Sequence, residues 1–171
     1  MDYLKALIRE VPDFPKPGIN FYDITTLLKD KDGYHDVIGG LRNAVAAVPC
    51  DMILGIEARG FMFAPTVAYA LRKGFVPVRK PGKLPHRTTR VEYALEYGKD
   101  ALEIHSDAIA PGQRIMIVDD VLATGGTAAA VGRLVEGLGG IVAGFAFVIE
   151  LDFLGGRGKL GTHGVSSLIH Y

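Results

Sequence analysis

The sequence has 171 residues, of which 49% are hydrophobic and 22% are charged, so it suits one folded domain with a substantial core and excludes a disordered chain. Lysine plus arginine number 19, and so do aspartate plus glutamate, so the charge balance indicates neither a nucleic-acid partner nor a membrane partner. The single cysteine, Cys50, excludes an intramolecular disulfide and is typical of the reducing cytoplasm.

The N-terminal segment predicts two helices separated by a rigid turn. Apolar residues at the spacing i, i+3, i+4, i+7 form one buried helix face, and this spacing occurs at Leu4, Leu7, Ile8 and Val11 and again at Tyr34, Val37, Ile38 and Leu41. Residues 12–18 contain three prolines in the run PDFPKPG, which cannot form a helix. The first residues carry acid early and lack a long apolar run, so a signal peptide is not expected.

The rest of the chain alternates apolar runs of strand length with helical patterns. We predict strands at 52–56, 75–79, 114–118 and 141–149, helices at 61–72 and 127–138, and a last strand at 167–170. The apolar runs are nearly continuous, as in strands that are buried on both faces of a parallel sheet. This order predicts an α/β fold with a twisted, mostly parallel sheet flanked by helices, and residues 1–171 as a single domain.

An insertion at about 82–105 separates two of the predicted strands. It is charged, and the alternation of Val91, Tyr93, Leu95 and Tyr97 predicts a hairpin arm. A long excursion between core strands is usually functional or mobile. We therefore expect a mobile hairpin above the edge of the sheet.

Polar residues follow the predicted strands. Ligands of such sheets bind beyond the carboxyl ends of the strands, and the segments there are 57–60, 80–83, 119–127 and 150–151. The site is therefore expected where these four segments meet.

The most informative pattern runs from Ile115 to Thr127 and reads IMIVDDVLATGGT. A strand ends in two carboxylates, and small residues then lead into a helix. Small residues let backbone N–H groups converge on an anion, and the helix N-terminus and the hydroxyls of Thr124 and Thr127 favour it further. Because Asp119 and Asp120 would repel a phosphate, we interpret them as ligands of sugar hydroxyls, or of water around Mg²⁺, beside it.

A second glycine-rich segment does not carry a function in this interpretation. Residues 156–161 match G-x-G-x-x-G, but they follow no clear strand and open no clear helix, so we interpret the match as a coincidence in a chain with 22 glycines. The segment 119–127 is not a Walker A loop either, since no Gly-Lys-Ser/Thr follows.

The thirteen residues 115–127 resemble the signature of the type I phosphoribosyltransferases. Four further segments resemble the adenine-specific members of that family in order and spacing, and together they extend over nearly the whole chain. They are 12–19 (PDFPKPGI), 57–61 (EARGF), 79–85 (RKPGKLP) and 95–98 (LEYG). The resemblance implies a type I phosphoribosyltransferase fold in which the insertion is the mobile hood.

The resemblance also implies binding roles for individual residues. Ribose hydroxyls are bound by Asp119 and Asp120, and the 5′-phosphate by Ala123, Thr124, Gly125, Gly126 and Thr127. Pyrophosphate faces Glu57, Ala58, Arg59, Lys80 and Lys83, with Arg79 beside them. The base pocket is built from Ile19, Asn20, Phe21, Tyr22 and Leu151.

Arg59 and Glu96 are the catalytic residues that the resemblance implies. Arg59 can hold phosphate oxygens with two N–H groups, and Glu96 could shuttle a proton at the base. Tyr97 of the hood could shield the site when the hood closes. Family members often carry a cis peptide in the segment of Arg59. Glu96 and Tyr97 would also suit a solvated hairpin, so this alternative stays open.

The reaction implied is a step of purine salvage. Adenine and 5-phosphoribosyl 1-pyrophosphate would give AMP and pyrophosphate, with Mg²⁺ held mainly by substrate and water near Asp119 and Asp120 rather than by direct protein ligands. The resemblance further implies a cytoplasmic homodimer that acts on small molecules, without a nucleic acid or a membrane as partner.

Three alternatives remain. The first is a phosphoribosyltransferase for hypoxanthine, guanine or xanthine. The sequence departs from the family at Tyr22, where other members commonly carry an arginine, so the edge of the base pocket is open to interpretation. The second is a regulatory protein that senses a sugar phosphate, which the absence of a basic patch disfavours. The third, a dinucleotide-binding oxidoreductase, is disfavoured by the context of residues 156–161.

Overall fold

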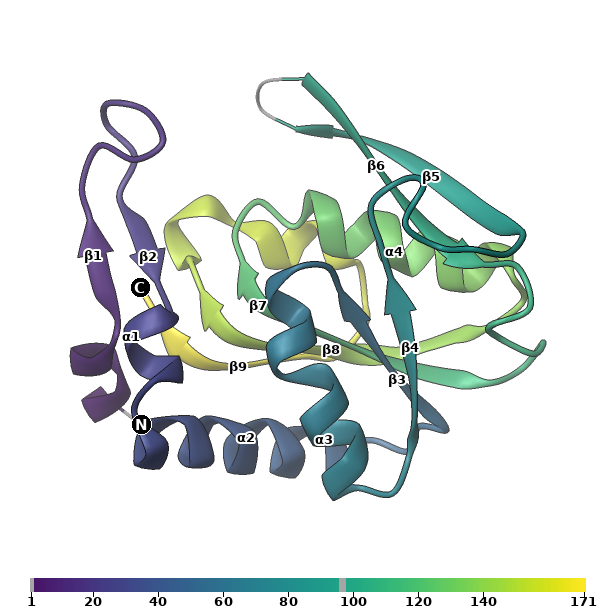
Figure 1. The fold of residues 1–171 in the computed structure, drawn as a ribbon, viewed down its shortest axis with the longest axis horizontal. Helices are drawn as coiled ribbons and strands as arrows, with labels where there is room; N and C mark the ends of the chain where they lie inside the picture. Colours follow the sequence, from purple (N-terminus) through teal and green to yellow (C-terminus); the bar gives the residue numbers. More distant parts are fainter. Residues whose placement is uncertain (1, 96–97) are drawn as a thin grey trace.

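A five-stranded sheet forms the centre of the fold (Figure 1). In the computed structural model, which describes residues 2–95 and 98–171, its strand order is β4-β3-β7-β8-β9 and all neighbouring strands run parallel. The strands are β3 (Met52–Ile56), β4 (Gly74–Val78), β7 (Arg114–Leu122), β8 (Ile141–Glu150) and β9 (Val165–His170). Ile53, Ile117 and Phe147 are fully buried, as continuous apolar runs require. The predicted α/β fold is confirmed.

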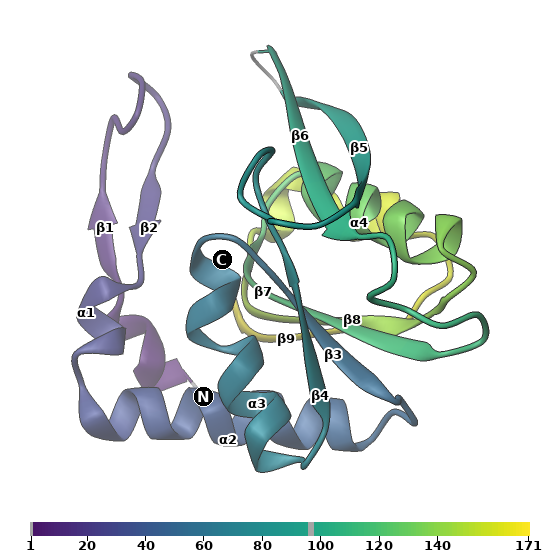
Figure 2. The ribbon, with the colours of Figure 1, turned by 45° about the vertical axis from the view of Figure 1, so that its right-hand side comes forward.

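Helices and a hairpin cover the two faces of this sheet (Figure 2). On one face lie α2 (Lys31–Ala46) and α3 (Ala64–Ala70), which pack with Val37, Leu41 and Val67 against the strands. On the other face lie α4 (Gly126–Gly137) and the hairpin of β5 (Thr88–Leu95) and β6 (Gly98–His105). The side chain of Asp30 accepts a hydrogen bond from the Gly33 amide at 2.8 Å and caps α2.

The predicted first helix is wrong at its C-terminal end. Residues Asp2–Leu7 form a 3₁₀ helix, and β1 (Arg9–Val11) then pairs antiparallel with β2 (Phe21–Asp23). Leu4 and Ile8 are buried as the helical spacing predicted. Val11 instead lies opposite Phe21, a pairing across the Pro-rich turn that local spacing cannot reveal. A short helix, α1 (Thr25–Leu28), joins β2 to α2.

The predicted hairpin at 82–105 is present as β5 and β6, which pair antiparallel from Thr88 opposite His105 to Leu95 opposite Gly98. Its base is anchored to the sheet, since Arg79 and Glu103 exchange backbone hydrogen bonds of 2.9 and 2.8 Å. Leu102 and Ile104 are fully buried in the core cluster that includes α4.

Three short 3₁₀ segments complete the fold: Arg59–Met62 after β3, and Asp152–Leu154 and Gly156–Leu160 between β8 and β9. Among residues 2–95 and 98–171, no helix has the length and apolar character that a membrane crossing requires.

Candidate active site

The loop between β7 and α4 forms a small cradle. The loop and the adjoining ends of β7 and α4 line a cavity of about 60 Å³. The lining residues are Asp119, Val121, Leu122, Ala123, Thr124, Gly125, Gly126, Thr127 and Ala128. Gly125 has φ +76° and stands immediately before α4, a conformation that favours glycine. The first N–H groups of a helix have no partner within it, so this cavity offers donors and the positive end of the helix dipole to an anion. All five residues predicted to bind phosphate lie here.

Asp119 and Asp120 lie inside strand β7, which continues to Leu122, four residues beyond its predicted end. Both carboxylates are buried, and Asp119 Oδ1 accepts the Asp120 amide at 3.0 Å. The Arg59 Nε atom lies 2.9 Å from Asp120 Oδ2 and forms an ion pair with it. Within the described residues, Asp120 Oδ2 accepts no aligned hydrogen bond, so it keeps acceptor capacity for a ligand.

Burial changes the acidity of this pair. It raises the pKa of Asp119 well above the usual carboxyl range, and the adjacent Asp120 charge raises it further. Burial also raises the pKa of Asp120, although Arg59 opposes that change. Two adjacent carboxylates in a dry site resist being charged together, so the pair is poised to ionise when a ligand supplies hydrogen bonds or positive charge.

The segment after β3 brings Arg59 to the acids. The Glu57–Ala58 peptide is cis, as the family resemblance implied. Gly60 allows close approach, because a Cβ there would lie 2.7 Å from Asp119 Oδ1 and 3.1 Å from the Val118 carbonyl oxygen. Gly60 is a site residue that the sequence interpretation passed over.

A second cavity, of about 390 Å³, adjoins the cradle and shares Val121, Ala123 and Thr124 with it. All five residues predicted for the base pocket line this cavity. The full lining is Ile19, Asn20, Phe21, Tyr22, Arg59, Val121, Ala123, Thr124, Leu151 and Leu154. β2 and the end of β8 therefore meet the signature loop, which local sequence patterns could not establish.

Aromatic contacts define the walls of this second cavity. The Arg59 guanidinium lies over the Phe21 ring, 5.3 Å from its centroid. Tyr22 packs against Tyr171 with ring centroids 4.0 Å apart. Arg59 thus connects the acid pair to the cavity.

Arg59, Arg79 and Lys80, three of the cations predicted at the pyrophosphate site, have acidic partners in this structure. Arg79 pairs with Glu57, and Glu57 Oε2 also accepts the Lys80 amide at 2.9 Å. That backbone hydrogen bond and Arg79 lower the pKa of Glu57. The Lys80 ammonium pairs with Asp100 of β6. Lys83 is exposed, and its carbonyl accepts from Arg79 at 3.1 Å.

The hood contributes residues that the sequence interpretation missed. Asp100 accepts a hydrogen bond from the Tyr93 hydroxyl at 3.1 Å as well as the Lys80 ammonium. Burial raises the pKa of Tyr93, and the neighbouring Thr127 of the cradle opposes that change. Tyr93 therefore lies where the hood meets the signature loop. Glu96 and Tyr97, predicted as catalytic and shielding residues, lie outside the described residues.

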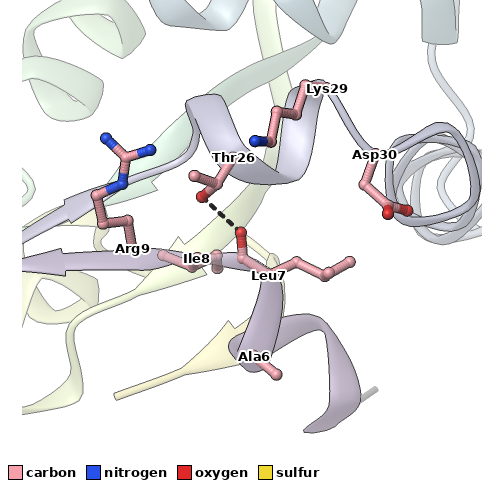
Figure 3. A pocket seen from close by; sticks show the side chains of 7 residues that line it. All are labelled: Ala6, Leu7, Ile8, Arg9, Thr26, Lys29 and Asp30. Atoms are coloured by element: carbon pink, nitrogen blue, oxygen red, sulfur yellow. Dashed lines mark hydrogen bonds between the residues drawn. The ribbon is translucent and has the colours of Figure 1, made fainter.

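Another cavity, of about 430 Å³, lies beside the N-terminal 3₁₀ helix and α1 (Figure 3). It is lined by Ala6, Leu7, Ile8, Arg9, Thr26, Lys29 and Asp30. The Thr26 hydroxyl already donates to the Leu7 carbonyl at 2.6 Å, and Arg9 lies 3.5 Å from Asp23. This cavity shares no residue with the two cavities at the strand ends, where the acids and the cradle lie.

Comparison with known proteins gives a consistent result. The family described as "Phosphoribosyl transferase domain" matches residues 31–158. An adenine phosphoribosyltransferase of Solibacter usitatus is 63% identical over 171 residues, which is 100% of this chain and 99% of the relative. A second such enzyme, from Acidobacterium capsulatum, is 62% identical over 168 residues, or 98% of this chain and 93% of the relative.

Solved structures agree with the sequence relatives. The adenine phosphoribosyltransferase of Thermoanaerobacter pseudethanolicus superposes with a TM-score of 0.96 at 54% identity, covering 99% of each chain. The Saccharomyces cerevisiae enzyme, complexed with an imino-altritol bisphosphate and adenine, superposes with a TM-score of 0.90 at 44% identity, covering 98% of this chain and 97% of that one.

Proposed function

The chain belongs to the phosphoribosyltransferase family, and on this premise we propose that its site joins adenine to 5-phosphoribosyl 1-pyrophosphate, giving AMP and pyrophosphate. One observation carries the proposal: a cavity of about 390 Å³ adjoins an anion cradle of about 60 Å³ through Val121, Ala123 and Thr124. A nucleotide has a flat, largely apolar base at one end and a phosphate at the other, so the two cavities match its two ends.

The larger cavity takes the base. Phe21 and Tyr22 supply aromatic surface, and Leu151 supplies aliphatic surface, so a flat ring can be buried between them. Ile19 and Asn20 also line the cavity, and we propose that their backbone groups discriminate the edge of the base. The related Saccharomyces cerevisiae structure is complexed with adenine, which supports adenine as the base.

The cradle takes the 5′-phosphate of the sugar donor. Amide groups of Gly125, Gly126 and Thr127 and the hydroxyl of Thr124 donate to its oxygens. Asp119 and Asp120 accept hydrogen bonds from the 2′- and 3′-hydroxyls of ribose. Burial of both acids supports this role, because the hydroxyls give them the partners that a buried carboxylate needs.

The pyrophosphate of the donor lies between β3 and β4. Arg59, Lys80 and Lys83 provide its positive charges, and the Ala58 peptide lines the same edge. Glu57 acts indirectly, since its carboxylate already orders Arg79 and the Lys80 amide. Arg59 exchanges Asp120 for pyrophosphate oxygens, and Lys80 exchanges Asp100, so neither cation is left buried and unpaired.

Mg²⁺ fits this donor set. The acid pair offers hard carboxylate oxygens, and Asp120 Oδ2 is buried with no aligned hydrogen bond among the described residues. Asp119 and Asp120 would hold the ion through water and the ribose hydroxyls. When bound, Mg²⁺ supplies positive charge against the pyrophosphate oxygens.

The chemical step exchanges one bond at C1′ of ribose for another. The bond from C1′ to the pyrophosphate oxygen breaks, and that oxygen keeps the electron pair. N9 of adenine bonds to C1′, and its proton leaves, with Glu96 as the proposed acceptor. Arg59 and Lys80 stabilise the negative charge that develops on pyrophosphate. The hood excludes water that would otherwise hydrolyse the donor, and we propose Tyr97 as its shielding residue.

We further propose that residues 1–171 act as one unit, since residues 19–22, which precede the family-matched region, line a cavity that is otherwise built from that region. A cytoplasmic homodimer is proposed on the grounds that symmetric pairs are the commonest oligomers and that Cys50 is the one cysteine. Exposed Tyr69 and Phe153 offer apolar surface for such a contact.

Turnover with adenine, guanine, hypoxanthine and xanthine tests the proposal. We expect adenine to have the highest kcat/KM by roughly 10⁴-fold or more, because a site that hydrogen-bonds one purine edge leaves its polar groups unpaired with another. Preference for a 6-oxopurine would replace the proposal with the neighbouring activity in the same family. No turnover with any of the four bases would refute it.

A further inference from the structure

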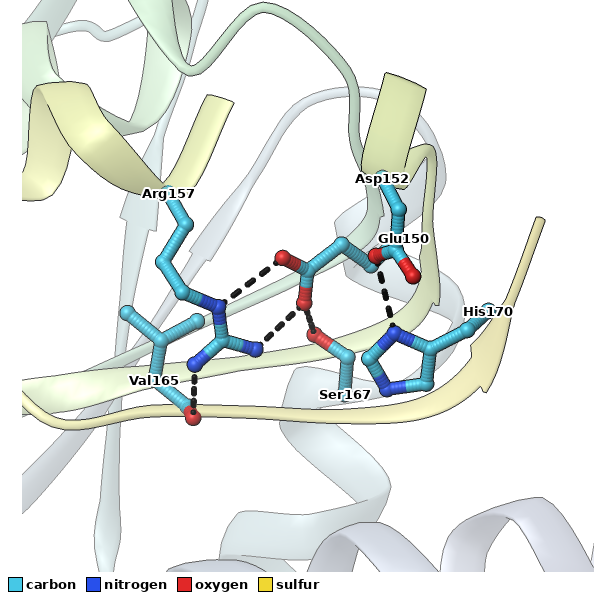
Figure 4. Close-up of polar contacts among 6 residues, drawn as sticks. All are labelled: Glu150, Asp152, Arg157, Val165, Ser167 and His170. Carbon is cyan, nitrogen blue, oxygen red and sulfur yellow. Dashed lines mark hydrogen bonds and ion pairs between the residues drawn. The ribbon is translucent and has the colours of Figure 1, made fainter. Parts of the chain in front are cut away.

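Glu150 and Arg157 form a bidentate ion pair between β8 and the 3₁₀ segment Gly156–Leu160 (Figure 4). Arg157 Nε lies 2.9 Å from Glu150 Oε1, and Nη2 lies 2.5 Å from Oε2. Arg157 Nη1 also donates to the Val165 carbonyl at 2.8 Å, and the Ser167 hydroxyl donates to Glu150 Oε2 at 2.6 Å. Glu150 is only 5% exposed.

The network is built to hold the guanidinium. Both Glu150 oxygens accept from Arg157. The neighbouring Asp152 and His170 pair with each other at 2.9 Å, and Glu150 has no free oxygen with which to join them. Arg157 lowers the pKa of Glu150, and Glu150 raises the pKa of Arg157. A planar, bidentate pair with a buried carboxylate fixes the direction of the arginine stem.

The residue before Arg157 touches the phosphate cradle. A methyl group on Gly156 would overlap the Ala123 carbonyl oxygen, and a Cβ there would lie 2.9 Å from the Gly125 nitrogen. A Cβ on Gly125 would in turn overlap the Gly156 carbonyl. The two glycines thus pack backbone against backbone. Leu160, at the other end of the segment, is buried in the core cluster that contains α4.

We propose that Arg157 is a positioning residue for the sugar donor: its ion pair with Glu150 holds Gly156 behind Ala123 and Gly125, and so fixes the loop that receives the 5′-phosphate. The inference rests on the proposed function of that loop. It also gives residues 156–161 a role that their resemblance to a dinucleotide motif did not suggest.

The base pocket should be less affected. Leu151 follows Glu150 directly, but its amide donates to the Leu122 carbonyl at 2.9 Å, so the strand anchors it independently of Arg157. Loss of the ion pair is therefore expected to act on the donor more than on adenine.

The test is steady-state kinetics of Arg157→Ala, Arg157→Lys and Gly156→Ala, together with calorimetric binding of ribose 5-phosphate. We expect Arg157→Ala to raise the donor KM about tenfold and to weaken ribose 5-phosphate to a similar extent, with the adenine KM changed less than about twofold. Arg157→Lys, which keeps the charge and one contact, should recover part of the loss. The His170→Ala variant, which breaks the neighbouring exposed pair, serves as the matched control and should behave as the unmodified chain.

Gly156→Ala decides the route of the effect. Its methyl group meets the loop directly, so this variant should raise the donor KM as well. The double variant Gly156→Ala/Arg157→Ala should raise the donor KM by no more than about the larger of the two single effects, because both changes act through one contact. Equal changes in both KM values, or a lower Tm with unchanged kinetics, would overturn the inference. If Arg157→Ala does not fold, the same comparison of donor KM with adenine KM is made on Arg157→Lys and Gly156→Ala. Failure of the unmodified chain to make AMP would instead refute the proposed function.

Discussion

Arg59 lies between the acid pair and the base pocket, with its Nε 2.9 Å from Asp120 Oδ2. Its guanidinium also covers the Phe21 ring, which lines the pocket. One side chain therefore touches the groups assigned to ribose and to the base, while its charge is assigned to pyrophosphate. The donor must replace Asp120 as the partner of Arg59, so Arg59 couples donor binding to the state of the acids.

Arg59→Ala should weaken use of the sugar donor far more than binding of adenine. We expect kcat/KM for the donor to fall by roughly 10²-fold, since a preorganised charge facing the leaving group is lost. Inhibition by pyrophosphate should weaken as well. Steady-state kinetics with each substrate varied would measure this, with Arg9→Ala, which breaks the exposed pair to Asp23, as the control. Equal losses for both substrates would mean that Arg59 is structural.

The double variant Asp119→Asn/Asp120→Asn should lose most of its turnover and keep its fold. Two buried carboxylates with raised pKa values cost stability, so we expect the amides to leave Tm unchanged or to raise it slightly. Turnover should fall at least about 10²-fold, because the ribose hydroxyls lose charged acceptors. Near-normal activity with an unchanged Tm would exclude the ribose-binding role.

Donor affinity should depend on pH through the same acids. The pKa values of both acids are raised in the folded protein. The folded protein therefore holds protons that the unfolded chain has already released. Its free energy of unfolding falls as the pH rises towards these raised pKa values. Ribose hydroxyls favour the charged form, so affinity should be lost as pH falls through those values, and binding should release protons. Calorimetry in buffers of different ionisation enthalpy would detect the protons. A binding heat that is independent of buffer would contradict the assignment.

Much of the fold follows from short-range pattern. The continuous apolar runs around Ile53 and Ile117 predict buried parallel strands, and the spacing of Val37 and Leu41 predicts α2. The spacing of Leu4, Leu7, Ile8 and Val11 misleads because the burial of Leu4 and Ile8 does not require an α-helix. The segment forms a 3₁₀ helix to Leu7, and the pairing of Val11 with Phe21 decides the strand.

The site could be predicted only in part, because several of its contacts join segments that lie apart in the sequence. The residues after each strand follow from the rule that parallel strands end at one edge, and the base pocket came from the family resemblance. The contacts of Asp100 with Lys80 and of Glu150 with Arg157 join segments whose spacing carries no signal. Gly156 and Gly60 matter because they lack a side chain where two backbones meet, which becomes visible only once both backbones are placed.

The hood should be mobile without ligand and become ordered with donor and Mg²⁺. The positive charges of Lys83, Arg87 and Arg90 attract an anionic donor. A ligand shifts the equilibrium between two conformations only if it contacts one of them better than the other, and these cations provide such a contact in the ordered hood. Hydrogen exchange over residues 82–100 would measure the change, with peptides from α2 as the internal control. High protection in the free protein that donor plus Mg²⁺ leaves unchanged would rule out gating and leave Glu96 as an ordinary hairpin residue.

A crystal structure of the chain with AMP tests the central claim most directly, because one ligand carries the base, the ribose and the phosphate together. We predict adenine in the cavity lined by Phe21, Tyr22 and Leu151, ribose hydroxyls on Asp119 and Asp120, and the phosphate in the cradle of Ala123–Thr127. AMP bound with its phosphate outside that cradle, or with its base away from the cavity, would contradict the account.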